Sequence, residues 1–234
     1  MPALVWDKSG EHFYETGVRK GVLYNFDKES NSYKTGTAWN GLTGVTESPE
    51  GAEPTALYAD DIKYLNLMSA EEWKGVITAY TYPDEFEKCD GCAELAAGVT
   101  IGQQDRETFG FSYQTRIGND TEGSEKGYKI HCVYGCIASP SEKAYATIND
   151  SPEAVEFSWD VNATPVEVTN HKPTATLVID STKISAKALA AVEALLYGST
   201  TASAQLPLPD AILSAITTAG QSADSTGSKS VKVN

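Results

Sequence analysis

The stretch FGFSYQTRIGNDTEGSEKGYKIHCVYGC, residues 109–136, decides the fold of this chain. Large side chains recur at every second position, first from Phe109 to Tyr113 and then from Tyr128 to Tyr134. A period of two is typical of a half-buried antiparallel strand. The polar, glycine-containing residues between the two runs have the composition of turns. The stretch therefore predicts two antiparallel strands separated by a turn.

The same alternation recurs on both sides of this stretch. It indicates further strands around residues 22–26, 155–161 and 175–179, with turn-forming sequences between them. A series of strands connected in this way favours packed antiparallel sheets. We therefore expect a mainly β fold, a sandwich or barrel of antiparallel sheets, over residues 1–182.

Two segments interrupt the strand pattern. Residues 46–54, TESPEGAEP, are acidic and rich in Pro and Gly, and they lie between strand-like runs around 37–45 and 55–67. Since no defined hairpin turn is indicated, we expect a long protruding loop over about 46–61, and loops of that length are commonly functional. The second segment, PDEFEKCDGCAEL at 83–95, is the best candidate for a short helix flanking the sheets.

The chain changes character after Thr182. Ser185 is placed to cap a helix, and Gly198 is placed to end it. The apolar side of this helix would carry Leu189, Val192, Leu195 and Leu196. With a second, weaker helix expected from Asp210, residues 183–219 are predicted to form a C-terminal helical extension. Residues 220–234 contain few hydrophobic residues and are expected to be disordered.

The formal net charge of the 234-residue chain is −14, from 32 Asp and Glu against 18 Lys and Arg. A protein that clamps a nucleic acid needs a basic surface, so this balance argues against such a role. It suits a soluble protein, or a surface past which nucleic acid moves without sticking. The first residues lack the pattern of a signal peptide, and no apolar stretch reaches the ~18 residues of a membrane helix.

The sequence carries no recognisable catalytic motif. The patterns G-x-S-x-G, G-x-G-x-x-G and Walker A do not occur, and the three histidines are isolated from one another. We expect a non-enzymatic protein without a cofactor. A hydrolase with a carboxylate site in the sandwich is an alternative, and it would require a cleft with close acids and raised pKa values.

Four cysteines are the candidate metal ligands, in the pairs Cys89-x-x-Cys92 and Cys132-x-x-x-Cys136. Paired cysteines can form a tetrahedral zinc site. On a regular strand, however, Cys132 and Cys136 would share a face and lie about 13 Å apart. That separation is too large for one metal ion or a disulfide, unless Gly135 makes a bulge. We expect four reduced, metal-free cysteines, and a zinc-stabilised binding module is the alternative.

Several long strings without periodicity are specific enough to resemble a known family. They are SPEGAEPTALYADDIKYLNLMSAEEW (48–73), TAYTYPDEFEKCDGCAEL (78–95), FGFSYQTRIGNDTEG (109–123), GYKIHCVYGCIASPSEKAYATINDSPEAVEFSWD (127–160) and TATLVIDSTK (174–183). From about residue 20 to residue 215, the chain resembles the major tail proteins of Firmicutes-infecting siphophages.

This resemblance implies the tail-tube fold, with two packed antiparallel sheets, a flanking helix and a long loop. It implies a structural virion protein whose copies close a ring, six to a ring, and whose rings stack around the DNA-ejection channel. The implied partners are other copies of the chain and other tail proteins, such as the tape measure and the terminator. DNA would pass without specific binding. The expected location is the virion tail, assembled in the bacterial host cytoplasm without a membrane anchor.

The acidic excursion is expected to supply the contact between stacked rings. The residues predicted for this contact are Glu47, Pro49, Glu50, Glu53, Leu57 and Tyr58. Leu57 and Tyr58 would be its apolar anchors, the kind of residue that carries interface energy. A head–tail connector or tail-terminator protein is an alternative, because such a protein forms a ring without long stacking.

Overall fold

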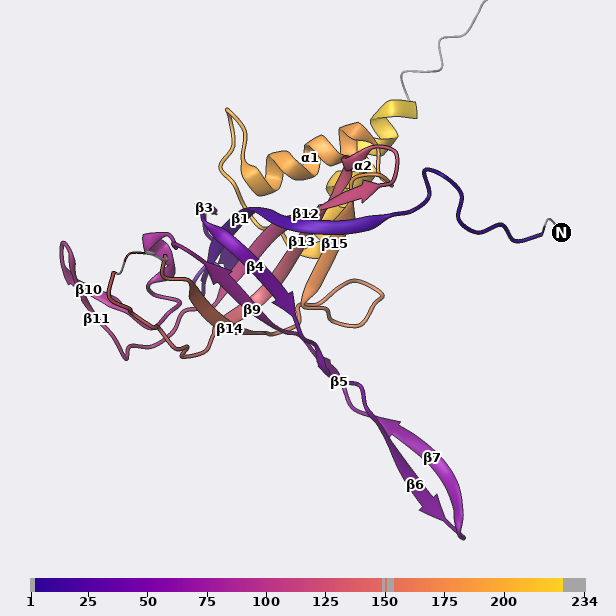
Figure 1. Ribbon diagram of the computed structural model, residues 1–234, viewed down its shortest axis with the longest axis horizontal. Coiled ribbons are helices and arrows are strands. Elements are labelled where there is room, and N and C mark those ends of the chain that lie inside the picture. Colours follow the sequence, from indigo (N-terminus) through magenta and orange to yellow (C-terminus); the bar gives the residue numbers. More distant parts are fainter. Residues whose placement is uncertain (1–2, 149, 151–153, 225–234) are drawn as a thin grey trace, which may run out of the picture.

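The computed structural model describes residues 3–148, 150 and 154–224 of the chain. In this part of the chain, two helices cover one face of an antiparallel β-sheet (Figure 1). The sheet has nine strands. They are β1 (Tyr14–Asp27), β2 (Ser32–Tyr33), β3 (Thr37–Trp39), β4 (Leu42–Glu47), β9 (Lys74–Ala79), β12 (Phe109–Asn119), β13 (Gly123–Ala138), β14 (Phe157–Ala163) and β15 (Thr176–Asp180). The predicted mainly β, antiparallel fold class is confirmed.

The strands follow the order β2-β1-β12-β13-β14-β9-β4, and β3 also pairs with β1. Strand β13 has two partners on one edge: β15 pairs with Lys129–Val133, and β14 pairs with Cys136–Ala138. Gly135, with φ +60°, lies between these two pairings. A Cβ atom there would lie 2.4 Å from the carbonyl oxygen of Thr164, so glycine is required at this bulge.

One hydrophobic core lies between the two halves of the bent sheet. Residues of β14 and β9 pack there against residues of β1, β12 and β13. The rings of Trp39 and Trp159 are 5.6 Å apart, and Phe86 lies 4.6 Å and 5.1 Å from them. The two packed layers implied by the resemblance are therefore halves of a single hydrogen-bonded sheet.

The segment expected as a helix over 83–95 has only one short helical turn. This turn, η1 (Asp84–Phe86), is a 3-10 helix that inserts Phe86 into the core. Gly91 has φ +76°, a left-handed conformation that ends helical geometry. The chain then forms a small hairpin of β10 (Ala93–Ala96) and β11 (Val99–Ile101).

A second core lies between the sheet and the helices α1 (Ala186–Tyr197) and α2 (Pro209–Asp224). Ser185 caps α1 as predicted, because its hydroxyl accepts the N–H of Ala188. Val192, Leu196 and Ile212 are buried against the sheet. The predicted helical extension is therefore a packed layer of the fold.

The second helix also runs further than the sequence predicts. Helix α2 continues to Asp224, past the boundary at residue 219. The remainder of the tail predicted to be disordered, residues 225–234, lies outside the described residues. Of the helices described, neither has the length and apolar character needed to cross a membrane.

Candidate assembly surfaces

Residues 48–72, here called the arm, project from the ends of β4 and β9 (Figure 1). The arm is a ribbon of β5 (Glu50–Gly51) with β8 (Glu71–Glu72), followed by β6 (Pro54–Ala59) with β7 (Ile62–Met68). The chain reverses at Asp60 and Asp61, whose φ angles are 51° and 62°. A left-handed pair is the geometry of a two-residue hairpin turn.

The protruding loop predicted over 46–61 is thus wrong in form and in length. It is one strand of a paired ribbon with a register shift between Leu57 and Tyr58, and the return strand is β7. The missed signal is Asp60-Asp61, because aspartate tolerates left-handed φ but is a weaker turn signal than Asn-Gly or Asp-Gly. Without that turn, 55–67 looks like one continuous strand.

One face of the ribbon is apolar and largely uncovered. Directly paired residues share a face, and the pairs are Leu57 with Leu65 and Ala59 with Ile62. Leu57, Leu65 and Ile62 are 41%, 38% and 65% exposed. Because a two-stranded ribbon alone is marginally stable in water, and apolar surface of this kind marks interaction sites, the arm has the character of a docking element.

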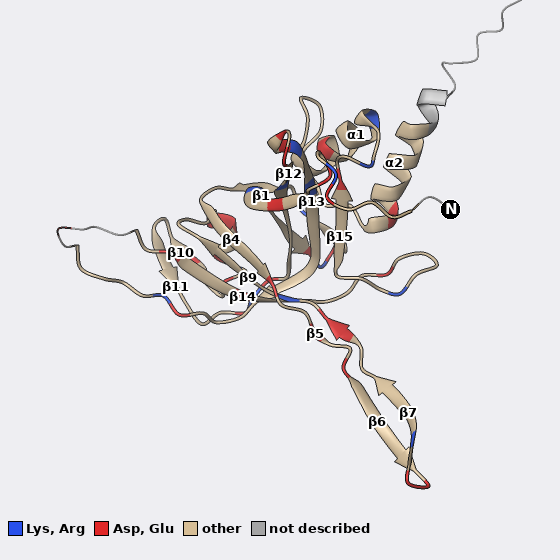
Figure 2. Ribbon diagram, turned by 45° about the vertical axis from the view of Figure 1, so that its right-hand side comes forward, with Lys and Arg blue, Asp and Glu red and all other residues tan. Residues whose placement is uncertain are grey.

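The arm is also acidic. It contains six carboxylates, Glu50, Glu53, Asp60, Asp61, Glu71 and Glu72, against the single base Lys63 (Figure 2). The side chain of Glu50 pairs with Lys74, which ties the base of the ribbon to β9. Among the described residues, Asp60 and Asp61 at the tip form no ion pair.

The six residues predicted for the inter-ring contact divide into two groups. Glu47 belongs to the sheet, where it accepts a 2.6 Å hydrogen bond from the Tyr113 hydroxyl, and Glu50 holds the arm's base. Pro49, Glu53, Leu57 and Tyr58 are exposed along the arm. Their role between rings stays a prediction. The sequence reading missed the exposed apolar residues of the return strand, which are Ile62, Tyr64, Leu65, Leu67 and Met68.

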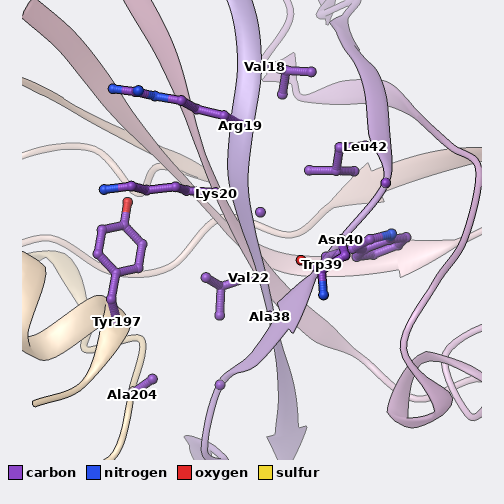
Figure 3. Close-up of a pocket in the computed structure, with 13 residues that line it drawn as sticks. Val18, Arg19, Lys20, Val22, Ala38, Trp39, Asn40, Leu42, Tyr197 and Ala204 are labelled. Atoms are coloured by element: carbon purple, nitrogen blue, oxygen red, sulfur yellow. The ribbon is translucent and has the colours of Figure 1, made fainter. Parts of the chain in front are cut away.

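A second surface is a cavity of about 570 Å³ beside β1, here called the basic pocket (Figure 3). Arg19 and Lys20 project from β1 to the same side of the strand. Consecutive residues of a regular strand point to opposite faces, but the register of β1 shifts on both sides of Arg19, and Lys20 has φ 50°. This irregularity brings the two cationic side chains together.

Both cations lie over aromatic rings. The guanidinium of Arg19 is 5.6 Å from the ring centre of Tyr128, and the ammonium of Lys20 is 5.4 Å from that of Tyr197. The Tyr128 hydroxyl donates to Glu193. Neither cation forms a salt bridge within the described part of the chain, and the buried Nε of Arg19 has no hydrogen-bond partner there.

The cysteines are not arranged as a metal site. The bulge at Gly135 places Cys132 in the core beneath the helices and Cys136 in the core between the sheet halves. The expectation that they share a face is therefore wrong. Burial raises the pKa of Cys89 and of Cys132 to about 12, which disfavours the thiolate that binds metal. In the described residues, no three His, Cys, Asp or Glu side chains are grouped for a metal ion.

Three carboxylates with close hydrogen-bond or ion-pair partners lack the environment of a general acid. A side-chain hydrogen bond from Ser30 lowers the pKa of Asp27, and the N–H of Gly10 lowers that of Asp120. The buried Asp90 is paired with both Arg106 and Lys143. A general acid would need a raised pKa, whereas the pKa of Asp27 and of Asp120 is lowered and Asp90 forms two ion pairs.

Comparisons with solved structures give distant likenesses, one of them to a baseplate chain. No family model matches the sequence, and no curated protein matches it. A chain in a cryo-EM structure of the anti-feeding prophage (AFP) baseplate, 6-fold symmetrised, aligns with a TM-score of 0.34 and 7% sequence identity. The alignment covers 75% of the present chain and 97% of that chain.

Proposed function

We propose that this chain is a structural subunit of a phage virion, the major tail protein that forms the tail tube. Its copies would close into rings, six to a ring, and the rings would stack around the DNA channel. The observation that carries the proposal is the arm, which projects an apolar face away from its own core. Such a face is stabilised when another copy covers it.

The sequence resemblance to siphophage major tail proteins supports the same proposal. A ring of identical subunits requires a heterologous contact, in which one surface of a subunit meets a different surface of the next. The arm and the body of this chain are two different surfaces, so the arm of one copy can contact the body of the next. The net charge of −14 also suits a tube whose wall must not retain DNA.

Electron microscopy of the concentrated protein in negative stain tests the proposal directly. Stacked tubes are the expected result. Single rings without stacks would favour the alternative of a head–tail connector or tail-terminator protein. A particle that stays monomeric at every concentration, salt and incubation time would contradict ring formation of either kind.

Removal of the arm gives the first mutational prediction. The N–H of Ser48 bonds to the carbonyl of Lys74, so the two ends of the arm are adjacent and a short Gly/Ser linker can replace residues 49–72. Because the arm contributes no buried core residue, the variant should unfold cooperatively with an unchanged midpoint, but it should form no long tubes. Circular dichroism and negative-stain microscopy measure the two properties.

The matched control shortens the other projecting hairpin, residues 94–100, by the same method. That variant should still assemble. Tubes of normal length from the arm-free protein would show that stacking does not depend on the arm, and loss of cooperative unfolding would show that the arm belongs to the folded core.

A further inference from the structure

We propose that the basic pocket at Arg19 and Lys20 receives the acidic tip of the arm, Asp60 and Asp61, from a second copy of the chain. This inference rests on the proposed function and deepens it, since it names the two surfaces that meet when copies assemble. The partner is recognised by two carboxylates flanked by apolar side chains.

The pocket has the form of a receptor for such a group. Its two cations point to one side because β1 is distorted there, with Lys20 in a left-handed conformation that a lysine rarely adopts. Bulges that redirect side chains are common next to functional sites. The walls beside the cations include the apolar side chains of Val18, Val22 and Leu42.

The two cationic side chains of the pocket also lack an acidic partner. Arg19 and Lys20 form no salt bridge with a described residue, although the chain as a whole has a net charge of −14. The Nε of Arg19 is buried with no hydrogen-bond acceptor among the described residues. The two cations are therefore not neutralised within their own subunit, and a carboxylate from a second copy would pair with each of them through a charge-assisted hydrogen bond.

The tip of the arm offers the complementary chemistry. Asp60 and Asp61 are exposed and have no ion pair in the described chain, and the adjacent Ile62 is 65% exposed. Two carboxylates would face the two cations, while Ile62 would meet the apolar wall. Charge complementarity of this kind sets register and orientation between partners.

The geometry assigns this contact to two different copies. The arm points away from its own body, whereas the basic pocket lies on β1 beside α1 (Figures 1 and 3). From Ser48 to Asp60 an extended strand spans about 40 Å, at about 3.3 Å per residue. The tip therefore reaches beyond its own subunit. Nucleic acid is the less suitable occupant, because two cations neutralise few of the phosphates that a backbone presents, whereas the tip of the arm presents two carboxylates.

Thiol cross-linking between two variants of the full chain tests the contact. Both variants carry Cys92→Ser, which leaves three buried native cysteines. One also carries Lys20→Cys and the other Asp61→Cys. When they are mixed and treated with a short, flexible bis-maleimide reagent, a linked dimer of one copy of each should form, because the reagent replaces the length of the lysine side chain that a direct disulfide could not span. The control replaces Lys20→Cys by Lys28→Cys, another exposed lysine, and should give no linked dimer.

The outcomes separate this inference from the proposed function. Tubes or rings without the Lys20–Asp61 link would overturn the docking contact and leave the proposed function standing. The link without tubes or rings would support the contact and contradict the proposed function. Absence of both would overturn both, and equal linking at Lys28 would overturn the specific contact.

Charge reversal provides a second, independent readout. Lys20→Glu and Asp61→Lys should each raise the critical concentration for assembly by about tenfold, because each turns an attractive pair into a repulsive one. The double variant, with both changes in one chain, should return to within about threefold of the wild type. Lys20 and Asp61 are exposed, so thermal unfolding should be unaffected. Additive losses in the double variant, or a preference of Lys20 for added inorganic phosphate or DNA over the arm, would overturn the contact.

Discussion

At the scale of single residues, His131 occupies one end of the core between the two halves of the sheet. The ring of Tyr113 stacks on it, with ring centres 4.6 Å apart and planes 3° from parallel. Its Nε2 lies 3.0 Å from the hydroxyl of Thr115. Burial lowers the pKa of His131, against the opposing effect of Glu47 and Glu15. The folded protein therefore favours the neutral ring.

This depressed pKa predicts a loss of stability in mild acid. The unfolded chain binds the proton more readily, at the ordinary histidine pKa of about 6.5. The contribution of His131 to the free energy of unfolding is therefore complete above that pH and is lost as the pH falls below it. Relative to His131→Gln, which cannot titrate, the wild type should lose urea stability between about pH 7.5 and 5.5. The exposed His171→Gln variant is the control, and parallel profiles for all three proteins would contradict the assignment.

Gly135 shows what residue-level reasoning from the sequence can and cannot predict. A glycine within a strand indicates that a bulge is possible, and the alternation from Tyr128 to Tyr134 correctly predicts which side chains share a face of β13, the face that packs in the core with the helices. After the bulge, the face of β13 on which each side chain lies depends on the close approach of Thr164 to Gly135, a contact between residues distant in sequence. The face of Cys136 was for that reason not predictable.

At the scale of elements, α1 is a structural layer. Val192 and Leu196 on its buried side pack in the same core as Tyr24 and Ile130 of the sheet. The hydroxyl of Tyr24 also donates a 2.6 Å hydrogen bond to the carbonyl of Leu196. Helix and sheet are therefore joined by apolar packing and by a buried polar contact.

Truncation of Leu196 tests this role of α1. Leu196→Ala removes a fully buried side chain and should lower the free energy of unfolding by about 2–5 kcal/mol, the range for a cavity left in a core. Leu213→Ala on α2 is the matched control, since its side chain is 60% exposed and should matter by less than about 0.5 kcal/mol. Urea denaturation measures both. Equal, small effects would mean that α1 is an appendage, as the sequence first indicates.

The elements that the sequence predicts are those with strong local signals. The Ser185 cap of α1 and the antiparallel pairing of β12 with β13 follow from nearby residues, and both are present. The half-buried character expected of β12 is wrong, because the helices cover its second face and bury Ser112 and Gln114. The arm lacked such a signal, because its turn is Asp60-Asp61 and its acidic base resembles a loop. The basic pocket was missed since it depends on the distortion of β1 against β3 and α1, which no local pattern records.

At the scale of the whole molecule, the shape and the charge have opposite effects on assembly. The arm offers an apolar face to another copy, whereas every copy carries a net charge of −14. Like-charged bodies repel one another over the Debye length, which is about 30 Å at 0.01 M salt and about 8 Å at 0.15 M.

The bending of one sheet into two layers has no counterpart in the sequence pattern, because strand pairing between distant segments determines it.

Salt should therefore promote assembly, by an amount that depends on the docking charges. Between about 0.01 M and 0.15 M salt, screening removes most of the repulsion between bodies, so the critical concentration of the wild type should fall. The same screening weakens the attraction between Lys20 and Asp61, which limits the gain. In Lys20→Glu that contact is repulsive, so screening helps twice and the critical concentration should fall further than in the wild type. Sedimentation of assemblies across both salt concentrations measures the two slopes. If salt instead dissociates wild-type assemblies, attraction at charged contacts outweighs the repulsion between bodies, and apolar packing of the arm is not the main source of affinity.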